Sequence, residues 1–162
     1  MHCAQPVKPS MKKQRWAVGA IIKIPIGNGR YSYGQLLSMG SIAVFEHLDD
    51  GSTDLTSLTG KSILFIVTIY ANVIPSGRWE KVGKLTLRPS LEKLPLKFIQ
   101  DSLKLENVEL YDPNDGTIKK ATKEKCVGLE AASVWAAEHV ESRILDHFEG
   151  KQNVWVERLA LK

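Results

Sequence analysis

The chain has 162 residues, a length typical of one domain and sufficient to bury a core without disulfides or metal ions. Hydrophobic residues make up 43% and charged residues 25%, which excludes a wholly disordered chain, and no apolar run approaches the ~20 residues of a membrane span. The formal net charge of +4 comes from residues 1–15, which hold four basic residues and no acid, and the remainder is formally neutral. This distribution argues against nucleic-acid binding, which requires cations clustered on the folded body.

Residues 1–14 are predicted to form a flexible basic tail, and residues 15–162 a single domain. Cys3 lies in the tail and Cys126 in the domain, so the two are predicted to be free thiols in a reducing compartment rather than a structural bridge. The N-terminus also lacks the apolar stretch of a signal peptide. Together these features predict a cytoplasmic protein.

Five strands are predicted in the first part of the domain, because β-branched and apolar residues fill short segments between turns. The predicted strands are residues 16–26, 30–38, 41–48, 62–71 and 79–88. Gly27-Asn28-Gly29 lies between the first two, where residues tolerant of positive φ predict a hairpin turn. Residues 62–71 are the most apolar run and are predicted to be a central buried strand.

A second hairpin is predicted further along the chain. Residues 106–112 alternate between apolar and polar side chains, residues 113–116 (Pro-Asn-Asp-Gly) have the composition of a turn, and residues 117–121 return. Residues 89–104 are undecided, because two prolines within them disfavour a long regular element.

One helix is predicted, over residues 129–149, where apolar side chains recur at helical spacing and Gly150 lies just beyond the end. Residues 153–161 alternate again and predict a last strand. The predicted fold is therefore α+β: a curved, barrel-like, mostly antiparallel sheet of about six or seven strands with one main C-terminal helix packed on it.

The sequence offers little catalytic chemistry. His139 and His147 are eight residues apart on the predicted helix, too far to share a metal ion without further ligands. Cys126 lacks the flanking glycines of a nucleophile elbow, and Gly27-Asn28-Gly29 lacks the Lys and Ser/Thr of a phosphate-binding loop. Paired carboxylates such as Asp49 and Asp50 are typical of solvated turns. We therefore predict no catalytic residue, no cofactor and no metal ion.

Two alternatives to a non-catalytic protein-binding role stay open. The first is a β-barrel module that binds nucleic acid through Arg30, Tyr31 and Tyr33, since the two tyrosines share one strand face and could stack on bases. The neutral body argues against it. The second is an uncharacterised enzyme, which no motif supports.

Four segments of the chain resemble the immunity protein 26 family of bacterial polymorphic toxin systems. Residues 24–34 (Ile-Pro-Ile-Gly-Asn-Gly-Arg-Tyr-Ser-Tyr-Gly) resemble its opening hairpin. Trp79 to Gly83 and Pro95 to Asp101 are similar to its middle motifs, and Gly128 to Arg143 to its C-terminal helix. The resemblance covers about residues 15–150 and leaves the N-terminal extension unexplained.

The resemblance implies an antidote that binds a cognate toxin and blocks it by steric occlusion. A nuclease toxin tends to be basic, so exposed acidic residues are the predicted contacts. The loop after the third strand supplies Asp49, Asp50 and Asp54, and the second hairpin supplies Glu106, Glu109, Tyr111 and Asp112. The acidic segment 101–116 is followed by the basic segment 119–125, so these two segments could instead pair with each other.

Overall fold

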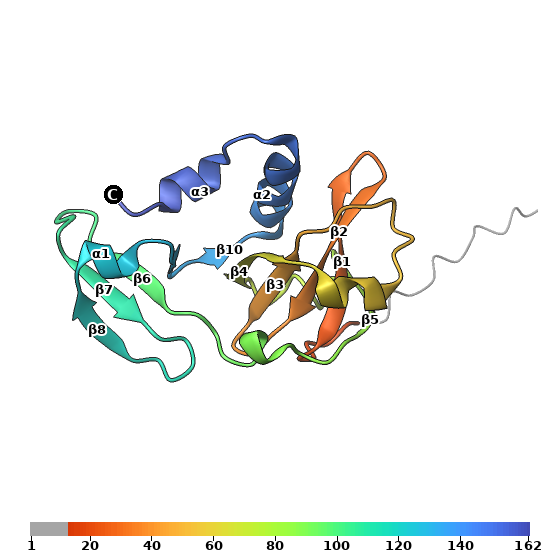
Figure 1. Cartoon of the computed structure of the whole chain (residues 1–162), viewed down its shortest axis with the longest axis horizontal. Coiled ribbons are helices and arrows are strands. Elements are labelled where there is room, and N and C mark those ends of the chain that lie inside the picture. The colour runs from red at the N-terminus through yellow and green to blue at the C-terminus, as the bar shows by residue number, and fades with distance from the viewer. Residues whose placement is uncertain (1–12) are drawn as a thin grey trace, which may run out of the picture.

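The computed structural model describes residues 13–162, and this part of the chain is an α+β protein with ten strands in two sheets (Figure 1). The predicted class is confirmed. Most of the predicted tail, residues 1–12, lies outside the described residues.

The first sheet has six strands in the order β10-β4-β3-β2-β1-β5. They are β1 (Ala20–Gly27), β2 (Arg30–Leu36), β3 (Ser41–Phe45), β4 (Ile63–Ile69), β5 (Glu80–Lys84) and β10 (Val134–Trp135). Neighbouring strands are antiparallel except for β10, which runs parallel to β4. All five residues of β3 are buried, because both faces of this sheet are covered.

The hairpin between β1 and β2 confirms the predicted turn. Gly27 pairs with Arg30, so Asn28 and Gly29 form a two-residue loop, and both have positive φ, 55° and 69°. This is the conformation of a type I′ turn, whose twist matches that of the flanking strands.

One face of the first sheet packs against helix α2 (Ala137–Glu149). Ile22 of β1 and Val140 and Ile144 of α2 belong to the same buried cluster. The other face is covered by the 3-10 helix η1 (Leu55–Gly60) and by a segment containing η2 (Pro89–Leu91). The main core therefore lies between the first sheet and α2.

The second sheet has four strands in the order β8-β7-β6-β9 and forms one end of the molecule (Figure 1). Its strands are β6 (Lys97–Gln100), β7 (Val108–Tyr111), β8 (Ile118–Ala121) and β9 (Glu130–Ala131). The predicted hairpin of residues 106–121 is confirmed as β7 and β8. Helix α1 (Lys123–Cys126) packs on one face, where Phe98, Val108 and Cys126 are buried together.

Two sheets replace the single barrel-like sheet that the sequence predicts, and neither closes into a barrel. The segment from Leu85 to Leu96, which contains both Pro89 and Pro95, runs from β5 to β6 without pairing as a strand. Since proline interrupts a ladder, β6 does not continue the first sheet and begins a new one.

The two sheets are joined by the segment 130–135, which contributes β9 to the second sheet and β10 to the first. Side chains reinforce this joint. The buried Lys97 of β6 donates to Thr68 Oγ1 of β4 at 2.7 Å. Arg143 of α2 donates two hydrogen bonds to Glu130 of β9, at 2.6 and 3.0 Å.

Near the C-terminus, the predicted helix is present as α2 but its predicted start is wrong, and the predicted last strand is wrong. The helix predicted over residues 129–149 begins only at Ala137, because the preceding residues extend to pair with β6 and β4. Residues 153–161, predicted as a strand, contain helix α3 (Val154–Leu159). Asn153 begins this helix by accepting hydrogen bonds from the N–H groups of Trp155 and Val156, both at 3.1 Å. Within residues 13–162, no helix combines the length and apolar character needed to cross a membrane.

Candidate partner-binding site

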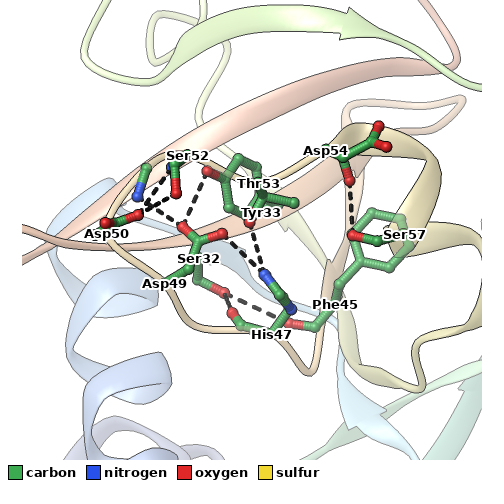
Figure 2. A network of polar contacts seen from close by, with 11 residues as sticks. Ser32, Tyr33, Phe45, His47, Asp49, Asp50, Ser52, Thr53, Asp54 and Ser57 are labelled. Carbon is green, nitrogen blue, oxygen red and sulfur yellow. Dashed lines mark hydrogen bonds and ion pairs between the residues drawn. The ribbon is translucent and has the colours of Figure 1, made fainter.

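The loop between β3 and η1 carries the first group of predicted contact residues. Its backbone is fixed to the edge of the first hairpin by a bridge in which Asp49 and Tyr31 exchange two hydrogen bonds, at 2.8 and 3.0 Å. The hydroxyl of Ser32 donates to the carbonyl oxygen of His47 at 2.8 Å. The loop is therefore held rigidly against β2 (Figure 2).

Asp49 points into the loop rather than out of it. One carboxylate oxygen accepts from the Gly51 N–H at 2.7 Å and from the Tyr33 hydroxyl at 3.2 Å. The other lies 3.0 Å from His47 Nε2. Burial raises the pKa of the Tyr33 hydroxyl, so it stays protonated as a donor at neutral pH. Asp49 thus holds the loop together, and both of its carboxylate oxygens already make contacts within the protein.

His47, Asp49 and Thr53 lie together like parts of a catalytic triad but do not have the connectivity of one. His47 Nε2 is 2.8 Å from Thr53 Oγ1 and 3.0 Å from Asp49 Oδ2. A triad histidine uses one ring nitrogen for the nucleophile and the other for the carboxylate. Because both contacts fall on the same nitrogen, His47 cannot relay a proton from Thr53 to Asp49.

Asp50 and Asp54 each cap a turn while their carboxylates stay exposed. Asp50 accepts hydrogen bonds from the Ser52 hydroxyl and from the Ser52 N–H, and these hold the pKa of Asp50 below its ordinary value. Asp54 accepts from the N–H and hydroxyl of Thr56, at 3.1 and 2.9 Å, at the start of η1. Residues 46–57 contain four acids and no Lys or Arg, so this rigid loop, here called the acidic loop, is strongly negative.

The second predicted group, on the β7–β8 hairpin, is partly engaged by neighbouring residues. Glu106 forms an ion pair with Lys123 at 3.0 Å, and Glu109 lies opposite Lys120 in the strand register. Asp112 caps its own turn by accepting from the Asn114 N–H and side-chain amide, at 2.9 and 2.7 Å. The expectation that the acidic and basic segments pair with each other therefore agrees with these contacts.

Tyr111, the remaining candidate, is partly exposed on the open face of this sheet opposite Ile118. A hollow of about 410 Å³ in the same sheet is lined by Ile99, Glu106, Glu109 and Lys120 but not by Tyr111.

The structure does not bring the two groups together. The acidic loop lies beside the first hairpin, whereas the β7–β8 hairpin forms the opposite end of the molecule (Figure 1). The two groups are therefore two separate candidate surfaces.

The residues that support the nucleic-acid alternative do not form a free stacking surface. Tyr33 is only 1% exposed, because it packs in a cluster with Ile21 and Phe45. Tyr31 is partly buried and is covered by Lys23, whose Nζ lies 4.2 Å from the ring centroid. A base could not stack on this pair without displacing core side chains.

The sequence analysis did not predict that the aspartates of these loops cap turns, although the sequence pattern for this is local. Asp50 and Asp54, like Asp115, are each followed two residues later by Ser or Thr, which is a pattern typical of Asx turns.

The sequence also did not predict a hollow of about 630 Å³ between residues 70–78 and the start of α2, lined by Tyr70, Arg78 and Glu138. Arg78 is held there by Glu138 and Glu141, at 3.1 and 2.8 Å. Within the described range, no group of three His, Cys, Asp or Glu residues is placed to hold a metal ion.

Fold and loop together define an α+β protein that carries a rigid, exposed acidic loop. A family model described as Immunity protein 26 matches residues 17–109, 93 of the 162 residues. The chain therefore belongs to the immunity protein 26 family. The match includes the first hairpin, the acidic loop and the middle motifs, but not residues 128–143, where the resemblance was expected to continue. No curated protein and no solved structure matches the chain.

Proposed function

We propose that the protein binds a cognate bacterial toxin and neutralises it by covering the toxin's functional surface, without catalysing a reaction. Membership of the immunity protein 26 family implies a toxin-neutralising role in general. The observation that carries the finer proposal is the acidic loop, which hydrogen bonds to β2 and within the loop hold in place without a partner. A preorganised loop loses little conformational entropy on binding, and its unpaired charge would attract a basic partner.

The acidic loop is a better candidate interface than the β7–β8 hairpin, because it holds more acids than the one neighbouring lysine, Lys23, can offset. Asp50 and Asp54 are exposed and form no ion pair with the described residues. Asp49, by contrast, supports the loop from within. We therefore propose Asp50 and Asp54 as contact residues and Asp49 as a positioning residue. Glu106, Glu109, Tyr111 and Asp112 remain a second proposed surface.

A basic toxin surface, such as that of a nuclease, is the partner that this charge favours. The proposal places both proteins in the cytoplasm and requires no cofactor. An interface of ordinary size buries roughly 800 Å² and about 20–30 residues on each partner, so neighbouring residues of the first hairpin would contribute.

The test begins with a pull-down of the tagged protein from a lysate of its native cells, at low and high salt. A single protein that is retained at high salt, and whose toxicity the purified protein suppresses, is the expected result. Recovery of nucleic acid alone, lost as salt rises, would contradict the proposal and favour a nucleic-acid-binding module.

Matched variants then locate the interface. The double variant Asp50→Asn/Asp54→Asn removes two charges but keeps the side-chain oxygens that cap the turns. We expect the double variant to associate with the captured toxin about tenfold more slowly than the unchanged protein at low salt. At high salt the two association rates should become similar. The control Asp112→Asn/Asp115→Asn makes the same change at the opposite end of the molecule. A larger effect of the control would assign the interface to the second hairpin.

A further inference from the structure

The outer edge of the second sheet is an exposed strand. β8 is the terminal strand of that sheet, and within residues 13–162 no other strand pairs with its outer edge. Ile118, Lys119 and Lys120 are all exposed, and Ile118 leaves 53% of its surface accessible. β8 is therefore available to another chain.

The backbone of β8 is oriented for pairing. The Asp112 N–H donates to the Thr117 carbonyl oxygen at 2.9 Å, so this carbonyl faces β7, while the Thr117 N–H donates to Asp115 in the turn. In an antiparallel ladder, alternate residues direct their backbone polar groups to opposite sides. Lys119 therefore also faces β7, whereas the N–H and C=O groups of Ile118 and Lys120 point away from the sheet. Such a row of groups is a template for one more strand.

The side chains along this edge indicate the chemistry of the incoming strand. Lys119, Lys120 and Lys125 form no ion pair with the described residues, although Lys120 lies opposite Glu109 in the register, whereas Lys123 is already paired with Glu106. A second copy of β8 would place lysines opposite lysines, which is unfavourable. A strand with carboxylates opposite Lys119 and Lys120, and an apolar residue beside Ile118, would match all three positions.

We propose that β8 binds an extended acidic segment of a protein partner, which adds a fifth strand to the second sheet. Main-chain hydrogen bonds to Ile118 and Lys120 provide affinity, and the two lysines provide selection for acidic residues. This surface is separate from the acidic loop, and the inference does not depend on the proposed function. The outward backbone groups and exposed Ile118 favour a peptide over a nucleic acid, which would use the lysines alone.

The probe is a fluorescently labelled, capped peptide, Thr-Val-Asp-Asp-Val-Thr, titrated with the full-length protein at low salt and followed by fluorescence anisotropy. Two variants separate charge from backbone pairing at one position. Lys120→Ala removes the charge and keeps the outward N–H. Lys120→Pro removes both, and proline is tolerated at an edge position whose N–H faces solvent. Circular dichroism and urea unfolding check that both variants are folded.

We expect Lys120→Ala to weaken peptide binding about two- to fivefold, and Lys120→Pro to weaken it by about a further tenfold. The same peptide with N-methylated valines should bind as weakly as the unmodified peptide binds the proline variant. Hydrogen exchange at the Ile118 and Lys120 amides should slow when the unmodified peptide is added. Equal effects of the two variants, no detectable peptide binding, or tighter binding of an oligothymidylate than of the peptide would each overturn the inference.

Discussion

The two sheets of this protein are built from different kinds of strand. In the first sheet, β3 is buried along its whole length and the strands of the first hairpin contribute to packing on both faces. In the second sheet, one face covers a small cluster while β8 is almost entirely exposed. This difference in burial indicates different roles for the two sheets. The first sheet stabilises the fold, and the second presents an edge and an open face to solvent.

Packing explains this division. The main cluster of the first sheet and α2 joins seventeen buried residues, whereas the cluster under the second sheet joins three. Because stabilisation grows with apolar area removed from water, most of it must come from the first sheet. The second sheet then depends on its attachment to the first, through the segment 130–135 and the Arg143–Glu130 and Lys97–Thr68 contacts.

The largest expected effect compares two matched truncations. Phe45 is 1% exposed and belongs to a cluster with the fully buried Ile21 and Leu58, so Phe45→Ala leaves a large buried cavity. We expect it to lower the free energy of unfolding by about 4–5 kcal/mol. Phe98 is 5% exposed and lies in the small cluster of three buried residues under the second sheet, so Phe98→Ala should cost less, about 3 kcal/mol. Urea unfolding measures both, and a larger loss for Phe98→Ala would reverse the comparison.

A smaller effect is expected at the joint between the sheets. Arg143 donates two hydrogen bonds to Glu130, and its guanidinium lies 3.9 Å from the Phe65 ring centroid. Lysine cannot reproduce the paired hydrogen bonds or the planar stacking. Arg143→Lys should therefore cost about 1.5–3 kcal/mol and speed hydrogen exchange in the second sheet more than in the first. The control Arg158→Lys changes an exposed arginine stacked on Trp155 and should cost less than about 0.5 kcal/mol.

The same joint bears on domain organisation. We propose that residues 15–162 unfold as one domain, as the sequence predicts, because both sheets share the segment 130–135. Tryptophan fluorescence and far-ultraviolet circular dichroism of the unchanged protein should then give coincident urea transitions. Two separated transitions would mean that the sheets are independent units.

The smallest expected effect is a pH dependence at the joint. Burial lowers the pKa of the Lys97 ammonium from 10.5, and the carboxylate of Glu130 opposes the shift. Between the lowered pKa and 10.5, the unfolded chain holds a proton that the folded protein has released, so stability rises with pH. Below that window, the full penalty of burying the charge is present.

The measurement is the difference in free energy of unfolding between the unchanged protein and Lys97→Met. At pH 7 the variant should be as stable as the unchanged protein or more stable, and its advantage should shrink as the pH rises towards 10.5. Lys93→Met, at an exposed position before β6, controls for the loss of a lysine. A difference that stays constant with pH would contradict this account.

The sequence by itself determined the features that arise from contacts between near neighbours. The turn at Asn28 and Gly29 and the turn of residues 113–116 produced the two predicted hairpins, because residues that favour tight turns fix the register of the strands beside them. The α+β class and the family were also predicted correctly. The turn-capping roles of Asp50 and Asp54 were readable in principle, since each side chain bonds a backbone group only two residues away.

Only the tertiary structure decided the features that depend on distant segments. Leu129 and Ala132 have helical spacing relative to Val140, yet the helix does not reach them, because Ala131 pairs with Phe98 and Trp135 pairs with Ile69. The division into two sheets and the separation of the acidic loop from the β7–β8 hairpin likewise follow from strand pairing across more than 60 residues of chain, as between β4 and β10. Local patterns record which residues favour a strand or a turn. They do not record which strand will be its neighbour, because that choice depends on how the whole core packs.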